Sequence, residues 1–254
     1  MMSAREKAFW HIHKGLPRQA PGSDASTRRL LELAKLPRTN MSVIDIGCGP
    51  GRSALVLAKN GFSVTAIDTS SLLLDELRSS VDAEELGNSI TIESASMFEL
   101  PYSDSSFDII WSEGAAYIAG WESAIRSWQR LLRPGGKMIL TECCWLTSMP
   151  SAATRHFWSK GYPTMLTVQQ AITLAQKNKL TVEATYILPD SDWWNEYYTP
   201  IERRLEEHGG SSDPALQEII FAEKQEIELR KSYPTEYGYV GFVLSRAAEL
   251  GVST

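Results

Sequence analysis

The sequence predicts a doubly wound α/β fold, with a sheet of seven mostly parallel strands whose last strand is antiparallel and with helical insertions that form a lid. A short apolar run over residues 43–46 meets a turn containing Gly47, Gly49 and Gly51, and a helical pattern starts just after it. Strand-like runs then alternate with helical patterns, as parallel sheets require. The 254 residues, 43% hydrophobic and 22% charged, suffice for the core of one large domain.

Apolar, β-branched runs mark the expected strands, which cover residues 42–46, 63–67, 90–93, 107–111, 137–142, 180–188 and 237–244. Apolar residues at helical spacing mark the expected helices, which cover residues 3–14, 26–34, 53–59, a segment after residue 70, 121–132 and 168–178. Ser70 or Ser71 is expected to cap the fourth of these, and Thr167 opens a capping box. Two further helices are expected in residues 189–236, the second with Asp213 as N-cap and Pro214 next. We expect an irregular stretch over residues 143–166 and a turn over residues 133–136.

Net charge is −6, which argues against a nucleic-acid-binding surface. The charge is uneven, because residues 1–40 carry eight Lys or Arg against three Asp or Glu, whereas residues 189–236 carry five against twelve. The basic arm could meet the acidic insertion or an anionic ligand group, or both faces could simply be solvated.

The three cysteines, Cys48, Cys143 and Cys144, form neither a disulfide framework nor a zinc spacing, and no metal site is expected. The adjacent pair could bind a soft metalloid substrate or belong to the core. No apolar run approaches membrane-spanning length, so we expect a cytoplasmic protein without a membrane partner.

The glycine turn is not a dinucleotide fingerprint, because the third glycine of Gly-x-Gly-x-x-Gly is replaced by Arg52. Asp45 lies two residues before the first glycine, where a phosphate would be repelled and a cationic amino group attracted. Asp68 ends the second strand, where an acidic residue takes ribose hydroxyls. These features indicate an adenosine that carries an amino-acid tail and no phosphates.

The sequence resembles class I S-adenosylmethionine-dependent methyltransferases, which implies a Rossmann-like fold. The resemblance rests on three ordered segments: residues 43–51 (VIDIGCGPG), 100–108 (LPYSDSSFD) and 131–137 (LLRPGGK). A closer resemblance, to a bacterial and archaeal small-molecule subgroup of type 11-like methyltransferase-domain proteins, rests on residues 20–23, 111–115, 187–189 and 237–239. Members of that subgroup mostly lack a defined substrate.

The turn residues that the resemblance places against the methionine part of the cofactor are Gly47, Cys48, Gly49 and Gly51. Asp45 is expected to anchor the cofactor amino group, directly or through water, or else to cap a helix or stabilise a loop. Asp68 is expected to accept hydrogen bonds from both ribose hydroxyls, or else to cap the following helix. Thr69 and Ser70 either contact the cofactor or cap.

At the adenine, the family's usual acidic residue is replaced by Ser96, followed by Met97. The Ser96 hydroxyl can still accept from the adenine amino group, at a cost of about 1 kcal/mol in affinity. Ser112 and Glu113 are expected to line the cofactor, and Glu113 could also be a general base, orient a substrate amine or hold an N-terminal residue. Tyr117 is a second catalytic candidate.

Arg18 would reach the cofactor carboxylate if residues 15–23 fold over the cleft, and is otherwise solvated. Aromatic residues crowd both insertions, where they could wall a substrate pocket, form the insertions' own core or make a homodimer interface. The predicted single domain therefore comprises an arm or lid (1–25), a cofactor-binding core (26–142), two substrate or lid insertions (143–166 and 189–236) and the last strand with the C-terminus (237–254).

The predicted function is transfer of a methyl group from S-adenosylmethionine to a small-molecule acceptor by in-line displacement. The cofactor supplies the reactivity and the protein supplies alignment and desolvation. Two alternatives are a non-catalytic cofactor-binding or interaction protein and an NAD-dependent oxidoreductase. Arg52 and the absence of a Tyr-x-x-x-Lys pair disfavour the second alternative.

Overall fold

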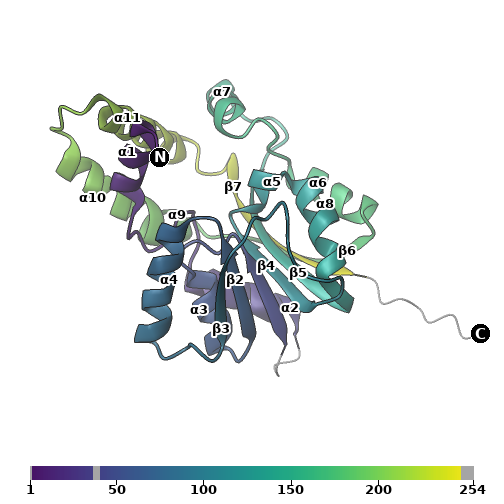
Figure 1. The fold of residues 1–254 in the computed structure, drawn as a ribbon. Helices are drawn as coiled ribbons and strands as arrows, with labels where there is room; N and C mark the ends of the chain where they lie inside the picture. The colour runs from purple at the N-terminus through teal and green to yellow at the C-terminus, as the bar shows by residue number, and fades with distance from the viewer. Residues whose placement is uncertain (1, 37–40, 247–254) are drawn as a thin grey trace, which may run out of the picture.

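The computed structural model describes residues 2–36 and 41–246, and within them seven strands form one sheet in the order β3-β2-β1-β4-β5-β7-β6 (Figure 1). The strands are β1 Ser42–Ile46, β2 Ser63–Asp68, β3 Ile90–Ser94, β4 Phe107–Glu113, β5 Leu132–Trp145, β6 Leu180–Ile187 and β7 Tyr237–Arg246. β7 is antiparallel to both of its neighbours, and the other pairs are parallel. The predicted doubly wound sheet with an antiparallel last strand is confirmed. Residues 247–254, the end of the predicted C-terminal part, lie outside the described residues.

The helices are α1 Ala4–His13, α2 Asp24–Ala34, α3 Arg52–Lys59, α4 Ser71–Ala83, α5 Ala116–Ala119, α6 Trp121–Trp128, α7 Ala152–Gly161, α8 Val168–Lys177, α9 Ser191–Trp193, α10 Thr199–His208 and α11 Pro214–Ser232. A 3₁₀ turn η1 (Gln129–Leu131) follows α6, and a π-helical turn η2 (Trp194–Tyr198) joins α9 to α10. Ser70, Thr167 and Asp213 are N-caps, as predicted. None of the helices in the described ranges is long and apolar enough to cross a membrane.

Two apolar layers sandwich the sheet. Helices α2, α3 and α4 cover one face, where Leu30, Leu57 and Leu77 are fully buried. Helices α5, α6 and α8 cover the other face, where Trp128 is fully buried. Buried side chains on both faces explain why the central strands read as continuous apolar runs in the sequence.

The expectation of an irregular stretch over residues 143–166 is wrong. β5 continues to Trp145, and helix α7 follows, with the Ser151 hydroxyl accepting from the Thr154 amide. Because α7 lies largely exposed, its sequence carries little apolar periodicity, which hid it. The turn expected over residues 133–136 is also part of β5, whose register against β4 shifts at this point.

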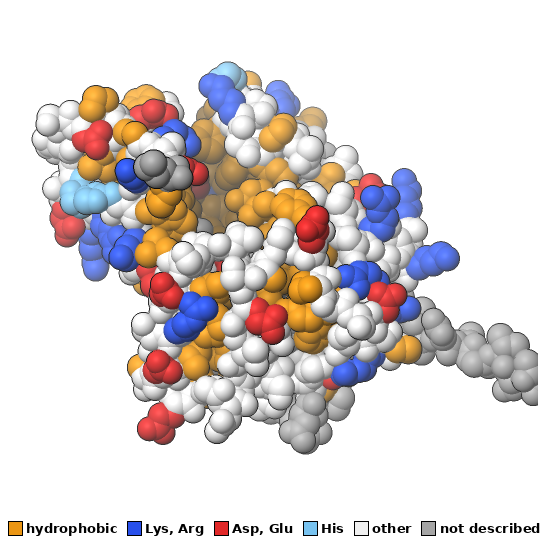
Figure 2. Space-filling model, viewed as in Figure 1, with side chains coloured by type: hydrophobic (Ala, Val, Ile, Leu, Met, Phe, Trp, Pro, Cys, Tyr) orange, Lys and Arg blue, Asp and Glu red, His pale blue; other side chains and the backbone are white. Residues whose placement is uncertain are grey.

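A third cluster lies beyond the carboxyl ends of the strands, where α1 packs against α10 and α11. Ion pairs join the basic arm to the acidic insertion, through Arg5 with Glu218 and Arg18 with Glu196. Of the alternatives that the uneven charge left open, the structure therefore realises contact between arm and insertion. Figure 2 shows a hollow with apolar walls between this cluster and α7.

Replacing Arg230 with methionine is expected to lower the free energy of unfolding by about 3 kcal/mol. The buried guanidinium donates to the Tyr237 carbonyl and to Asp190, both at 2.7 Å, and stacks 4.2 Å from the Trp193 ring centroid, so it ties α11 to β7. Urea unfolding measures the loss. Arg203→Met, the same change at an exposed position of α10, is the control, and an equal loss there would contradict the assignment.

Candidate functional site

The turn after β1 brings the backbone to the carboxyl edge of the sheet. Its glycines all have positive φ, at +70° for Gly47, +55° for Gly49 and +83° for Gly51. A Cβ on Gly47 would lie 2.6 Å from the Ala115 Cβ, and one on Gly51 would lie 2.1 Å from a Leu77 methyl. The turn therefore requires glycine for its conformation and for its close packing.

Asp68 organises this turn from the end of β2. Its Oδ2 accepts from the Gly49 amide at 3.0 Å, and its Oδ1 accepts from the Ser70 amide at 2.8 Å. Each carboxylate oxygen has room for about two hydrogen bonds. Asp68 can therefore hold the turn and still accept from two hydroxyl groups.

A cavity of about 410 Å³, here called the turn cavity, opens over the glycine turn and the ends of β2 and β4. This volume lies within the range of small-molecule sites. The predicted site residues that line it are Arg18, Gly47, Cys48, Gly49, Asp68, Thr69, Ser96, Met97, Glu113 and Tyr117. Residues that the sequence analysis did not propose as ligand contacts also line it: Phe9, Trp10, Arg52, Leu73, Ala95, Phe98 and Ile118.

Three predicted site residues do not line the turn cavity. Asp45 is fully buried, and its Oδ2 accepts from the Ser53 hydroxyl at 2.6 Å, while its Oδ1 has no hydrogen-bond partner among residues 2–36 and 41–246. Burial raises the pKa of Asp45 to about 7. Ser112 is fully buried and donates to the Ile46 carbonyl, and Gly51 packs against α4. All three residues therefore lie next to the glycine turn but outside the lining of the turn cavity.

Arg18 joins the arm to three carboxylates. Its Nε donates to Glu196, one terminal nitrogen to Glu113 and the other to Asp24, each at 3.0 Å. Burial would lower the pKa of Arg18, but these carboxylates hold it above its ordinary value. Glu113 also accepts from the Thr27 hydroxyl at 2.7 Å. These contacts correspond to one of the roles left open for Glu113, namely binding of an N-terminal residue.

The far end of the turn cavity is formed by the loop after β3. The Ser96 hydroxyl accepts from the Phe98 amide at 3.2 Å, which leaves its own hydrogen free to donate and one lone pair free to accept. The Trp128 indole donates to the Met97 carbonyl at 3.0 Å and so fixes this loop to α6. Phe98 is 66% exposed at the rim.

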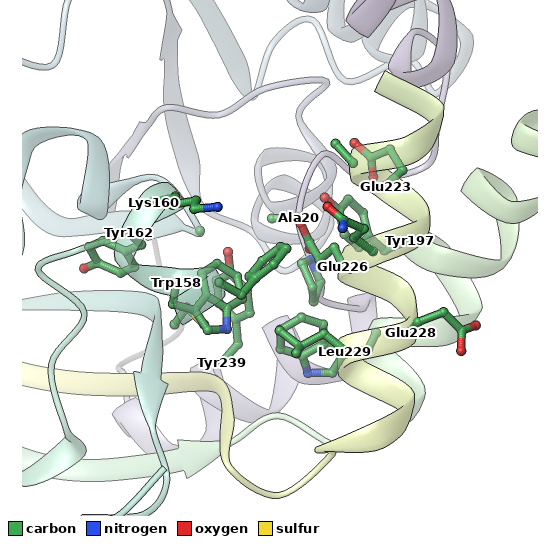
Figure 3. A pocket seen from close by; sticks show the side chains of 18 of the residues that line it. Ala20, Trp158, Lys160, Tyr162, Tyr197, Glu223, Glu226, Glu228, Leu229 and Tyr239 are labelled. Carbon is green, nitrogen blue, oxygen red and sulfur yellow. The ribbon is translucent and has the colours of Figure 1, made fainter. Parts of the chain in front are cut away.

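A second cavity of about 1050 Å³, here called the aromatic cavity, adjoins the turn cavity. The two share Phe9, Gln19, Ala20, Pro21, Gly114 and Tyr117. Aromatic side chains from β7, α7 and η2 gather in its wall, and Figure 3 shows Trp158, Tyr162, Tyr197 and Tyr239. Residues 19–21 of the arm thus line both the turn cavity and the aromatic cavity, which adjoin beside Tyr117.

Two glutamates in this wall were missed in the sequence. Glu142, on β5, is 2% exposed, and burial raises its pKa to about 8. Glu226, on α11, has its pKa raised to about 7, by burial first and then by Glu223. The sequence carried a signal for each of them. Glu142 is an acidic residue in an otherwise apolar strand, and Glu226 lies on the same helix face as Ile219, seven residues earlier.

Glu142→Gln is expected to raise the free energy of unfolding at pH 8 by up to about 4 kcal/mol. The pKa of Glu142 rises from 4.5 to about 8 in the folded protein, so the carboxyl group costs stability as pH rises across this range. An amide does not ionise and escapes that cost. Urea unfolding at pH 5 and pH 8 measures the difference. Glu122→Gln, at an exposed position of α6, is the control, and a gain no larger at pH 8 than at pH 5 would contradict the prediction.

An open sheet of this topology with a glycine turn at the carboxyl end of β1 defines a Rossmann-like nucleotide-binding fold. Residues 43–136 match the family model described as a methyltransferase domain. This region is therefore a methyltransferase domain of the class I S-adenosylmethionine-dependent type, which confirms the resemblance.

Relatives in sequence and structure agree with that assignment. The chain is 29% identical over 148 residues to methyltransferase GfsG of Streptomyces halstedii, covering 58% of this chain and 53% of the relative. It is 35% identical over 121 residues to 27-O-demethylrifamycin SV methyltransferase of Amycolatopsis mediterranei, covering 46% and 44%. The fold is shared with phosphoethanolamine N-methyltransferase 2 of Haemonchus contortus in complex with S-adenosylmethionine, at a TM-score of 0.70, 19% identity and coverage of 95% and 56%. The chain thus spans about half the length of these curated relatives.

Proposed function

We propose that the protein transfers a methyl group from S-adenosylmethionine to a small-molecule acceptor, with the cofactor in the turn cavity and the acceptor in the aromatic cavity. The observation that carries this proposal is the shared wall of the two cavities at Gly114 and Tyr117. Methyl transfer requires the methyl group of the cofactor to face the accepting atom of the substrate in a site that excludes water. The relatives include a methyltransferase named for a rifamycin, a small molecule.

The turn cavity fits the cofactor by its chemistry. Asp68 retains acceptor capacity for the two ribose hydroxyls, and Thr69 lies beside it. Ser96 and Met97 offer polar atoms to the adenine edge. Two N–H groups of Arg18 remain beyond its three ion pairs, and they suit the cofactor carboxylate. When bound, the cofactor supplies an electrophilic methyl group on a sulfonium.

The protein's own residues would then align and enclose the reactants. Glu113 holds Arg18 and thereby keeps the arm over both cavities, so it acts as a positioning residue. Tyr117 is 41% exposed and faces the junction, where it can contact the acceptor. Asp45 does not line the turn cavity. It would act either by stabilising the backbone of the turn or by binding the cofactor amino group through a water molecule. The homodimer and the cytoplasmic location expected from the sequence stay predictions.

Calorimetric titration of the purified protein with S-adenosylhomocysteine tests the cofactor assignment. We expect micromolar binding that NADH does not displace. Incubation with tritiated S-adenosylmethionine and a fractionated metabolite extract then tests the transfer, with label expected in a small, extractable product. Displacement by NADH would support the oxidoreductase alternative, and binding without any labelled product would support the non-catalytic one.

A further inference from the structure

The aromatic cavity contains two carboxylates without a cationic partner. Glu142 accepts from the Cys143 amide at 2.9 Å through Oε1, and hydrogen bonding from the Tyr162 side chain and the Tyr117 backbone partly offsets the effect of burial on its pKa. Glu226 accepts from the Tyr198 hydroxyl at 2.8 Å. Within the described ranges, neither glutamate makes an ion pair with a lysine, arginine or histidine.

The cationic groups that line the cavity lie elsewhere. Arg5 is exposed and paired with Glu218, and His156 and Lys160 are exposed on α7. Figure 3 shows Lys160 on the α7 side, across the cavity from Glu226. The interior of the cavity therefore carries acidic groups that an incoming cation could ionise, and its cationic groups lie at the rim.

The rings around these carboxylates add a second preference for positive charge. Trp158, Tyr162 and Tyr239 lie together in the wall, and Tyr197 lies beside Glu226 (Figure 3). Aromatic faces attract ammonium groups by about 0.5–2 kcal/mol each when water is excluded. A cavity of this volume also has space for a sizeable apolar body.

Both glutamates face the junction with the turn cavity. Burial raises the pKa of Tyr117, and the negative charges of Glu142 and Glu226 raise it further, so both carboxylates lie within electrostatic reach of this side chain. Tyr117 also lines the turn cavity. A cation bound by these glutamates is thus held near Tyr117, at the junction with the turn cavity.

We propose that the acceptor is an amine attached to an apolar body, bound as its ammonium form by Glu142 and Glu226 within the aromatic cavity. The inference rests on the proposed function and adds the substrate class. An ammonium group lowers the pKa of a neighbouring carboxyl group and pairs with its ionised form, whereas an uncharged alcohol gains no such pairing from these two carboxyl groups. A phosphate or carboxylate ligand would be repelled by them.

The test uses 4-phenylbutylamine and 4-phenylbutan-1-ol, which differ only in the terminal group. Each is titrated by calorimetry into the full-length protein saturated with S-adenosylhomocysteine at about pH 7.5, where the amine is protonated. We expect the amine to bind at least about tenfold more tightly than the alcohol, from charge pairing and ring contacts. The double variant Glu142→Gln, Glu226→Gln is expected to bind both probes equally.

Glu202→Gln is the matched control, because Glu202 lies on α10, pairs with Lys231 and lines neither cavity. It should keep the preference for the amine. The single variants repeat the measurement if the double variant fails to fold, and each should lose part of the preference. Equal binding of the two probes by the unmodified protein, no binding of the amine, or a preference that survives the glutamine changes would overturn the proposal. Failure of the proposed function is seen separately, as absence of S-adenosylhomocysteine binding.

Discussion

Replacing Asp68 with alanine is expected to weaken binding of S-adenosylhomocysteine about a hundredfold. Two hydrogen bonds from ribose hydroxyls to a carboxylate contribute about 1.5–3 kcal/mol each, and 1.4 kcal/mol corresponds to tenfold in affinity. The same change removes the acceptor of the Gly49 and Ser70 amides, so the turn also loses its fixed shape. Calorimetry on the folded variant gives the ratio of dissociation constants.

Asp68→Asn separates these two contributions. The amide keeps the size of the side chain and one oxygen acceptor, so a loss of about tenfold is expected. Asp75→Ala on α4 is the matched control, because Asp75 is exposed and pairs only with Arg78 among the ion pairs of the described chain. Unchanged affinity in Asp68→Ala would exclude the ribose assignment.

Arg18→Met is expected to lower the free energy of unfolding by about 3–5 kcal/mol, the usual result of removing one partner of a buried ion pair. Arg18 is 6% exposed, and its loss leaves the partly buried Glu113, whose side chain is 14% exposed, without its cation. Because the arm then loses its link to η2 at Glu196, trypsin or chymotrypsin should cleave it faster.

The double variant Arg18→Met, Glu113→Gln makes this prediction sharper. It should recover part of the lost stability, because no uncompensated charge remains at Glu113. Arg78→Met, at an exposed surface pair, should change neither unfolding nor proteolysis. A double variant that is less stable than the single one would contradict the account of Glu113 as the partner of Arg18.

The fold was predictable because its signals are local. Strands buried on both faces appear as apolar runs, and the caps at Ser70 and Asp213 mark where helices begin. Helix α7 was missed because it carries few buried residues, and the extension of β5 depends on pairing with β7, which lies far away in the sequence. The division of the chain into an arm, a core and two insertions stays a prediction.

Only the part of the candidate site that is formed by the glycine turn and the neighbouring strand end was predictable from the sequence. The glycine turn and Asp68 could be assigned because their spacing fixes their positions around the carboxyl ends of β1 and β2. The aromatic cavity is assembled from segments more than 200 residues apart, so no local pattern predicts that Glu142 and Glu226 face the same space. Asp45 occupies the position that the family motif predicts, but its side chain accepts a hydrogen bond from Ser53 and does not line the turn cavity.

The packing of α1 against α11 has a consequence for how the protein is made. Ile12 of α1 is fully buried, and its helix contacts a helix that begins at Pro214. During synthesis the arm leaves the ribosome about 200 residues before the helix that it packs against. Strands β1 to β5 can pair meanwhile, since their contacts are closer in sequence and precede α11. Closure over the two cavities therefore requires a contact between segments about 200 residues apart and follows the pairing of the strands that lie between them.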